Sequence, residues 1–407
     1  MSIPGAVLAP QVSRGLMLLF AVAAGLSVAN VYYAQPLLDM LARDFAISRA
    51  AIGVVVTATQ VGCGLALVFL VPLGDIVDRR RLMTMQLGLL VIALAVVGTA
   101  RSPTALLAGM LGVGLMGTAM TQGLISYAAS AAAPHERGHV VGATQGGVFL
   151  GVLLARVFAG GISDLAGWRG VYVCSTLLML GLALPLRKGL PMLASRRGHT
   201  SYMQLLVSMF TLLRDEHVLR IRGALALFMW AAFNIFWSAL VLPLGSPPYN
   251  FSHTAIGAFG LVGAVGALAA ARAGRLADRG FGERTSAAAL LLLLLAWWPL
   301  SLMPWSLWML VIGILLLDMG GQALHVTNQS LILRSKPEAH SRLIGLYMLF
   351  YAAGSGLGAI GTTAIYAYAG WNGVCLLGAA VSLLALLFWL ATFRISFSSR
   401  HTAATDK

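Results

Sequence analysis

Residues 166–171, Ala-Gly-Trp-Arg-Gly-Val, recur as residues 369–374, Ala-Gly-Trp-Asn-Gly-Val, 203 positions further along the chain. A second segment, Gly-Asp-Ile-Val-Asp-Arg at residues 74–79, recurs as Gly-Arg-Leu-Ala-Asp-Arg at residues 274–279, an offset of 200. Half of the 407 residues is 203.5, so both offsets predict that the chain is a duplication of one structural unit.

The composition identifies the kind of unit that is duplicated. Hydrophobic residues make up 59% of the chain and charged residues only 10%. Soluble domains carry about 25% charged residues, so a water-soluble enzyme is excluded. A membrane-spanning helix needs about 20 apolar residues. Twelve such runs are present, at residues 15–38, 50–73, 82–100, 104–129, 139–162, 170–186, 223–244, 255–271, 285–303, 307–330, 343–368 and 373–393.

Six spans in each unit define the predicted architecture. Because six is even, both units enter the membrane from the same side, and the predicted fold is an all-α membrane protein of twelve transmembrane helices in two parallel six-helix repeats. Residues 1–186 form the first bundle, residues 187–222 a linker and residues 223–407 the second bundle. The linker carries one apolar stripe at helical spacing, typical of an amphipathic helix in the membrane interface. Its members are Tyr202, Leu205, Leu206, Met209, Leu212 and Leu213.

The basic residues predict the orientation. The chain has 27 basic and 13 acidic residues, a net charge of +14. With a cytoplasmic N-terminus, 22 of the basic residues fall in cytoplasmic segments and 4 in outer loops, as the positive-inside rule requires. Both termini are therefore predicted to be cytoplasmic. Topology and attraction to anionic lipid headgroups account for the positive charge, so the expected partner is the lipid bilayer and no nucleic acid is expected.

The repeated Gly-x-x-x-Asp-Arg segment follows the second predicted span of each half, and with it the chain resembles the major facilitator superfamily along essentially its whole length. Residues 30–36 and 317–322 are similar to runs in bacterial inner-membrane permeases that are often grouped with drug/proton antiporters. The resemblance implies that family's fold, location in the bacterial inner membrane and transport by alternating access. It also implies a cytoplasmic gate motif at Gly74, Asp78, Arg79, Gly274, Asp278 and Arg279.

The resemblance further implies that spans one, four, seven and ten line a substrate cavity. Span seven then presents two tryptophans and an asparagine at i, i+4 and i+7, which lie on one helix face and favour either an aromatic wall for an amphiphilic ligand or ordinary packing. The candidate cavity residues on the first three of these spans are Asn30, Tyr33, Gln122, Trp230, Asn234 and Trp237.

Asp318 is the one acidic residue that falls deep inside a predicted span. It lies 11 residues from the start of span ten, roughly 16 Å into a core roughly 30 Å thick. A charge there costs roughly 3 kcal/mol and needs a partner, water or a proton. Gln322, His325 and Gln329 share its helix face. We therefore predict that Asp318 and His325 couple transport to protons and that the two glutamines line the cavity; the alternative is a structural hydrogen-bond network.

Arg156, in span five, is the second charge within a predicted span. It stands where the antiporter pattern has a glycine. Two contacts are possible for it: its side chain extends outward toward Asp164, or it pairs with Asp318. The sequence alone is compatible with either contact.

Other chemistry is not indicated. The three cysteines, Cys63, Cys174 and Cys375, are single, and there is no metal-ligand cluster, Walker motif or nucleophile–base arrangement, so no cofactor, no metal and no enzymatic activity are expected. The sequence predicts a monomeric secondary transporter, driven by the proton gradient, that exports small amphiphilic molecules. The alternatives are a metabolite importer or facilitator of the same fold, and, in another class, a membrane-embedded enzyme or a non-transporting sensor.

Overall fold

The computed structural model describes residues 12–133, 135–191, 201–335 and 340–405, and over these residues the chain is helical. The first half of the chain contains α1 (Arg14–Tyr32), η1 (Gln35–Leu37), α2 (Leu38–Asp44), α3 (Val54–Leu65), η2 (Ala66–Leu70), η3 (Pro72–Asp75), α4 (Arg79–Gly98), α5 (Pro103–Ala131) and α6 (Arg137–Gly189). The helix α7 (Tyr202–Asp215) follows, at the position of the predicted linker helix. Part of that linker, residues 192–200, lies outside the described residues.

The second half repeats this order with small differences. It contains α8 (His217–Ala239), α9 (Val241–Leu244), α10 (His253–Val262), α11 (Val265–Leu276), η4 (Ala277–Phe281), α12 (Gly282–Leu295), α13 (Trp297–Ser301), α14 (Leu307–Ser335) and α15 (His340–Thr405). Several of these helices begin at a polar side chain that caps them. Ser102, for example, accepts a hydrogen bond from the amide of Ala105 and is followed by proline, which suits the first position of α5.

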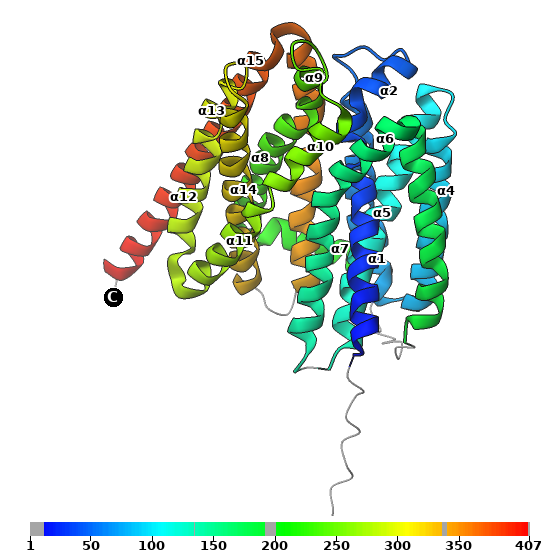
Figure 1. Ribbon diagram of the computed structural model, residues 1–407. Coiled ribbons are helices and arrows are strands. Elements are labelled where there is room, and N and C mark those ends of the chain that lie inside the picture. Colours follow the sequence, from blue (N-terminus) through cyan, green and yellow to red (C-terminus); the bar gives the residue numbers. More distant parts are fainter. Residues whose placement is uncertain (1–11, 134, 192–200, 336–339, 406–407) are drawn as a thin grey trace, which may run out of the picture.

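Two helices, α6 with 53 residues and α15 with 66, are long enough to cross a membrane twice, and both change direction at a glycine. Gly167 in α6 has φ 69° and Gly370 in α15 has φ 58°, which glycine adopts without a Cβ clash. Each is the glycine of the repeated Ala-Gly-Trp segment. Figure 1 shows α15 rising in orange and returning in red. Within the described residues, nine helical segments are long and apolar enough to cross a membrane, including these two, and the count of twelve spans stays a prediction.

The helices form two bundles that face each other. In the first, α1 packs on α5 and α6, and α3 and α4 pack on α5; in the second, α8 packs on α15, and α11 and α12 pack on α14. Figure 1 shows the first half at the right, in blue to green, and the second half at the left, in green to red. The helix α7 contacts η3 on one side and α8 and α15 on the other, so it bridges the two bundles.

The bundles touch toward one end of the molecule. We call the end where α1 begins the lower end, and the opposite end the upper end, as drawn in Figure 1. The helix α3 meets α15 where Thr57 donates a hydrogen bond to the carbonyl of Gly356, 2.8 Å away, and α6 meets α10 where Gly160 lies against the backbone of His253. Both contacts lie in the upper half, because α3 and α10 begin at the upper end.

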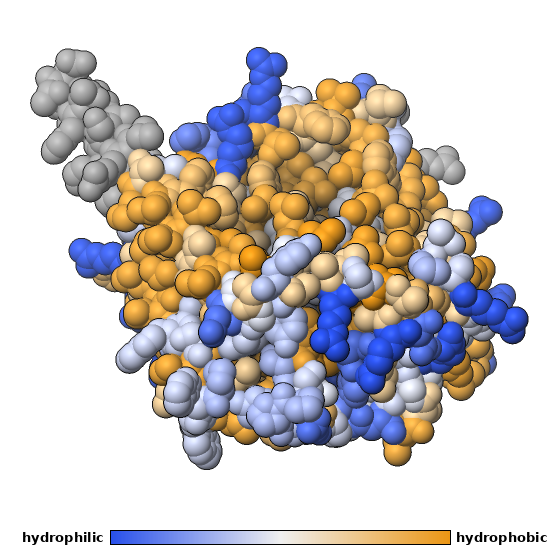
Figure 2. All heavy atoms as spheres, turned by 90° about the horizontal axis from the view of Figure 1, so that it is seen from above, coloured by the Kyte–Doolittle hydropathy of each residue, from blue (hydrophilic) through white to orange (hydrophobic). Residues whose placement is uncertain are grey.

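The outer surface is apolar, as a lipid-facing surface must be. Figure 2 shows the upper end, where orange apolar side chains extend around much of the rim and blue hydrophilic residues are interspersed. Large hydrophobic side chains are exposed on helices of both halves, among them Leu18, Met85, Ile92, Leu177, Leu291, Trp308 and Leu376. The helices of each bundle therefore pack through their buried faces and leave a large apolar outer surface. A surface of this size and composition is typical of a protein in a lipid bilayer.

Candidate functional site

The candidate site lies where α1, η1, α6, α8 and α14 approach one another in the middle of the molecule. Trp230, Asn234 and Trp237 occupy one face of α8, as their spacing predicts, and all three are buried. The ring of Trp230 lies edge-on to those of Phe233 and Tyr351, at centroid distances of 5.1 and 4.5 Å. The indole N–H groups of both tryptophans are buried without a hydrogen-bond partner. The face of α8 therefore combines aromatic surface with unused donors.

A chain of hydrogen bonds crosses from one half to the other at this level. The Nη2 of Arg156 donates to Oε1 of Gln35 at 3.0 Å, and Nε2 of Gln35 donates to Oδ1 of Asn234 at 2.9 Å. Asn234 in turn donates to the hydroxyl of Ser355 at 2.9 Å. Arg156 and Gln35 belong to the first half, and Asn234 and Ser355 to the second. Gln35 is thus the residue that joins the buried arginine to the aromatic face of α8.

Arg156 is buried, with 4% of its surface exposed. Its guanidinium carbon lies 4.0 Å from the ring centroid of Trp237 and 5.7 Å from that of Tyr32, which are cation–π distances. The structure contains neither of the two ion pairs weighed from the sequence: Arg156 pairs with neither Asp164 nor Asp318. Its Nε has no hydrogen-bond partner.

Asp318 lies in the middle of α14 and is likewise 4% exposed. Its Oδ2 has no hydrogen-bond partner. The opposing surface is a row of glycines: a Cβ added at Gly263 would lie 3.0 Å from Oδ2 of Asp318, and one added at Gly260 would lie 3.3 Å from Cδ of Arg156. Gly260 lies in α10 and Gly263 caps its C-terminal end, so both charged side chains lie against the same short segment of the chain.

The remaining polar residues of α14 continue toward its lower end. His325 Nδ1 lies 2.9 Å from the hydroxyl of Tyr347, and its Nε2 lies 3.3 Å from Nε2 of Gln329. The imidazole ring is 5.5 Å from the ring of Trp230. Gln322 is half-buried and lies against Gly266. The structure therefore brings His325 onto the aromatic face of α8 and onto α15, and gives it no hydrogen bond to Asp318.

The other predicted cavity residues lie within the first half. The amide of Asn30 accepts a short hydrogen bond from Ser175 and donates to the carbonyl of Leu26 at 2.8 Å, so both ends of its side chain are satisfied. Tyr33 stacks at a tilt on Phe158, 5.3 Å between centroids, and is buried. Gln122 is half-buried on α5. These residues place polar groups near the site, and Arg156 is the buried charged side chain that the first half contributes to it.

The predicted gate motif forms a local turn in the first half. Asp78 caps α4 by accepting a hydrogen bond from the amide of Arg81, and Arg79 donates to the carbonyl of Gly74 at 2.8 Å and to groups on α5. The second copy turns at Gly280, which has φ 89°. Gly274 lies against Val326 of α14, Arg279 is exposed, and the side chain of Asp278 lies outside the described residues.

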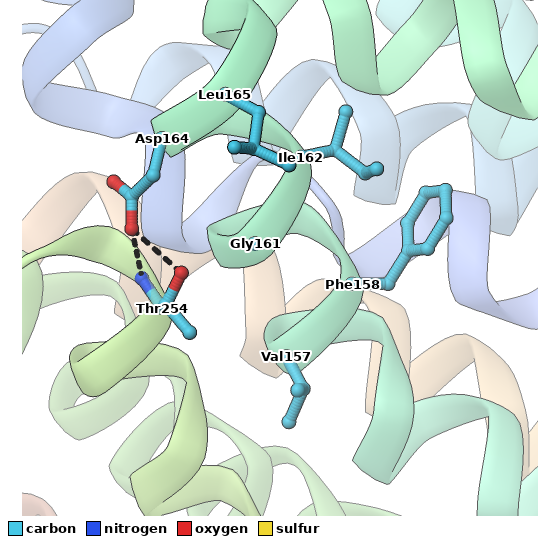
Figure 3. A pocket seen from close by; sticks show the side chains of 7 residues that line it. All are labelled: Val157, Phe158, Gly161, Ile162, Asp164, Leu165 and Thr254. Atoms are coloured by element: carbon cyan, nitrogen blue, oxygen red, sulfur yellow. Dashed lines mark hydrogen bonds between the residues drawn. The ribbon is translucent and has the colours of Figure 1, made fainter.

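A cluster at the upper end, which sequence reasoning did not identify, joins the two halves. His253 begins α10, and its ring nitrogens lie 2.9 Å from Oδ1 of Asp39 and 3.2 Å from Oδ1 of Asp164. Asp164 also accepts hydrogen bonds from the backbone amides of His253 and Thr254 and from the Thr254 hydroxyl. Figure 3 shows the two hydrogen bonds between Asp164 and Thr254, beside a groove lined by apolar side chains of α6. The only signal in the sequence was an acid at the end of a span.

The charge of His253 depends on these neighbours. The hydrogen bond to Asp39 raises the pKa of His253 above its ordinary value, with help from the charges of Asp39 and Asp164 and against the effect of burial. Asp39 itself is paired with Arg43 at 2.6 Å. The imidazolium form is therefore favoured while the two halves are in contact.

Metal chemistry finds no support in the part of the chain that the structure describes. There, no group of three or more histidine, cysteine or acidic residues is arranged to hold a metal ion. The three cysteines are free thiols, two of them buried.

Comparisons with known proteins agree with this architecture. A family model described as Major Facilitator Superfamily matches residues 18–272 and again residues 223–406. An uncharacterized transporter of Escherichia coli (strain K12), YgaY, is 41% identical over 94% of this chain and 97% of its own length. SCO4007 of Streptomyces coelicolor, described as a probable transporter, is 30% identical over 93% of this chain and 87% of its own. Among solved structures, a bacterial homolog of the human lysosomal transporter Spinster, in an inward-facing and occupied conformation, superposes with a TM-score of 0.74 at 15% identity, covering 93% of this chain and 96% of that one.

Proposed function

The chain belongs to the major facilitator superfamily of membrane transporters, and on that premise we propose that it is a proton-coupled secondary transporter that exports small amphiphilic molecules by alternating access. Membership establishes a transporter of this fold, whose relatives are generally not enzymes. The direction of transport, the proton coupling and the ligand class belong to the proposal.

The observation that carries the proposal is the buried carboxyl group of Asp318. A carboxylate at this depth is costly when ionised and tolerated when neutral, so protonation changes the free energy of the conformation that buries it. Its Oδ2 has no hydrogen-bond partner, and no basic side chain of the described residues forms an ion pair with it, so the ionised form is stabilised only by the more distant charge of Arg156. Binding and release of a proton can therefore bias the equilibrium between two conformations, which is what coupling requires.

The contact between the halves supports alternating access. In this conformation α3 meets α15, and α6 meets α10, in the upper half of the bundle. With both termini in the cytoplasm of a bacterial cell, as we propose, the lower end is the cytoplasmic one and the outer side is closed. Arginine-rich segments at the lower end are in keeping with this orientation. We also propose that the twelve-span bundle works as a monomer.

An importer or facilitator of the same fold remains the second candidate, because Asp318 would serve symport as well as exchange. A sensor or membrane-embedded enzyme has no specific observation in its favour, since Asp318 and the unpartnered donors lie in the middle of the helices.

The test is transport by purified protein in vesicles that enclose a pH-sensitive dye, screened with a panel of amphiphilic compounds. We expect Asp318→Asn, which mimics the neutral acid at nearly constant volume, to lose accumulation driven by a pH gradient while exchange down a substrate gradient survives. His325→Gln should shift the pH optimum without eliminating transport. Asp215→Asn, at an exposed position on α7, is the matched control. Wild-type accumulation by Asp318→Asn vesicles would place the coupling site elsewhere.

A further inference from the structure

Two buried ionisable side chains of opposite sign share the candidate site without forming an ion pair or a hydrogen bond with each other. Arg156 and Asp318 are each 4% exposed, and they lie against Gly260 of α10 and against Gly263, which caps the end of that helix. No ion pair joins them, since their nitrogen and oxygen atoms are more than 4.0 Å apart. Buried charges in proteins are normally paired, because an unpaired one loses its hydration without compensation. This arrangement therefore calls for an explanation.

The guanidinium is held away from Asp318 by specific contacts. Gln35 accepts a hydrogen bond from Nη2, and the guanidinium carbon lies over the indole of Trp237, 4.0 Å from the ring centroid. Gln35 is itself fixed by Asn234. These contacts leave Nε of Arg156 and Oδ2 of Asp318 without partners. Arg156 thus keeps one unused hydrogen-bond donor and Asp318 one unused acceptor, and the two atoms do not meet.

The surroundings of the two charges are aromatic and also carry unused donors. Trp230 and Trp237 flank the region on one face of α8, and neither indole N–H has a partner. A small cavity beside Arg156, of about 10 Å³, is lined by Gln35, Trp237 and apolar residues of α9 and α10. This volume is enough for about one water molecule, so a larger ligand enters only when the halves move apart.

We propose that the site binds a zwitterionic aromatic amphiphile, whose anionic group pairs with Arg156, whose cationic group pairs with Asp318 and whose ring lies against Trp230 and Trp237. The proposal rests on the proposed transport function and specifies the substrate class for that site. A ligand with a single charge would pair one of the two residues and leave the other buried and uncompensated, whereas a zwitterion compensates both. Aromatic rings stacked on tryptophan supply further affinity.

The same pairing explains exchange for a proton. The cationic group of the ligand and a proton compete for the carboxylate of Asp318, while Arg156 stays charged throughout. Binding of one therefore releases the other, as an antiporter requires. Arg156 selects the anionic group and takes no part in the proton exchange.

The test measures binding to the protein in nanodiscs, without any gradient, using compounds that differ only in charge. The probes are tryptophan, its methyl ester and N-acetyltryptophan, with the same three derivatives of 2-naphthylalanine as a larger set. At pH 6 these are a zwitterion, a cation and an anion, whereas closer to neutral pH the α-amino group of the ester begins to lose its proton. We expect the zwitterion of at least one set to bind about tenfold more tightly than either derivative, because each derivative loses one charge-assisted contact. No binding in either set, or equal or tighter binding of a derivative, would overturn the proposal.

Two variants make the assignment of each charge specific. Arg156→Gln should remove the disadvantage of the methyl ester, and Asp318→Asn should remove that of the acetyl derivative, so that selectivity shifts in opposite directions. Arg156→Lys should keep the zwitterion preference. Arg101→Gln and Asp215→Asn, both exposed, are the matched controls for the loss of each charge. If Arg156→Gln does not fold, the Asp318→Asn shift alone decides. If Arg156→Gln and Asp318→Asn each change the affinity for all three compounds equally, the two residues have only a structural role and the proposal is refuted.

These measurements separate the substrate class from the proposed function. Zwitterion-selective binding without gradient-driven accumulation would keep the inference and refute proton coupling. Accumulation of a compound with a single charge, together with no selective binding of zwitterions, would keep transport and refute the inference.

Discussion

His253 is the residue whose chemistry most directly depends on contact between the two halves. Its ring lies between Asp39 and Asp164, which both belong to the first half, and Arg43 pairs with Asp39 from the far side. The hydrogen bond to Asp39 raises the pKa of His253 from its ordinary 6.5. The stabilisation of the contact is therefore complete below about pH 6.5 and is lost as the pH rises through the raised pKa.

We expect the upper ends of the two halves to separate as the pH is raised from 6 to 9. Spin labels at residue 101 in the first half and residue 368 in the second, both exposed, would report this as a lengthening of the distance between them. The comparison is made in an Asp318→Asn background, so that the proposed coupling carboxyl does not titrate. There the distance should respond to pH while His253 is present and should not respond in His253→Gln, which keeps a polar side chain without the titration. An unchanged wild-type distance across this range would refute the role of His253.

At the residue scale, the sequence allowed us to predict those site residues that belong to a regular spacing along a helix. Asp318 and the Trp230, Asn234 and Trp237 face followed from helix spacing and from the rarity of charge in apolar runs. Gln35 lies within residues 30–36 but carries no such signal, because a neutral amide is ordinary near a helix end. Its role depends on η1, which turns it toward Arg156 and Asn234, and such a turn has no simple spacing.

Glycines fix how closely the elements of the two halves approach. A Cβ at Gly160 of α6 would lie 2.2 Å from the carbonyl oxygen of His253, whereas one at Gly161 would meet only Thr254 Oγ1 at 3.9 Å. Gly160 and Gly161 are neighbours in α6, but only Gly160 lies so close to the backbone of α10 that a Cβ would clash with it.

We expect Gly160→Ala to destabilise the closed upper contact by about 1–3 kcal/mol, because backbone cannot move aside as a side-chain end can. Gly161→Ala should be neutral or slightly stabilising, since alanine favours helix by about 1 kcal/mol over glycine. The label pair at residues 101 and 368 and the thermal unfolding midpoint measure both effects. Equal behaviour of the two variants would contradict the close approach of α6 and α10.

At the scale of elements, the sequence predicted where the long helices change direction better than it predicted the short helices. Gly167 and Gly370 fall where the predicted spans five and six, and eleven and twelve, are joined. The short helix α9 lies within the predicted run 223–244, because its residues are as apolar as those of that span. The short helix α2 begins at the last residue of the predicted run 15–38, and its charged residues Asp39, Arg43 and Asp44 place the rest of it outside every predicted span.

The two halves are predicted to be separable folding units. Most helix packing is within each bundle, and α7 with residues 192–200 provides the covalent link. We expect fragments divided at Gly198 to reassemble when co-expressed and to copurify from membranes through a tag on one of them. A division at Arg101, between α4 and α5 of one bundle, is the control and should assemble poorly. Failure of the Gly198 fragments to copurify would assign α7 a larger part in folding.

For the molecule as a whole, duplication and span content were readable from the sequence, because a parallel repeat leaves matched glycines and apolar runs. The conformation was not readable. Whether α3 meets α15 at the upper end depends on a small difference in free energy between two arrangements of the same two bundles. The same residues line the interface in both arrangements, so their pattern in the sequence does not distinguish them.

The position of the closed contact above Arg156 and Asp318 has an electrical consequence. A potential across the bilayer falls mainly over the closed region, so moving that region from above the two charges to below them changes the potential at which they sit. Each unit of charge then contributes about 2.3 kcal/mol per 100 mV. With Asp318 ionised the two charges cancel, and with Asp318 protonated one positive charge remains. We therefore expect voltage to bias the reorientation of the protonated carrier alone, and a transient current after a voltage step at low pH to report it.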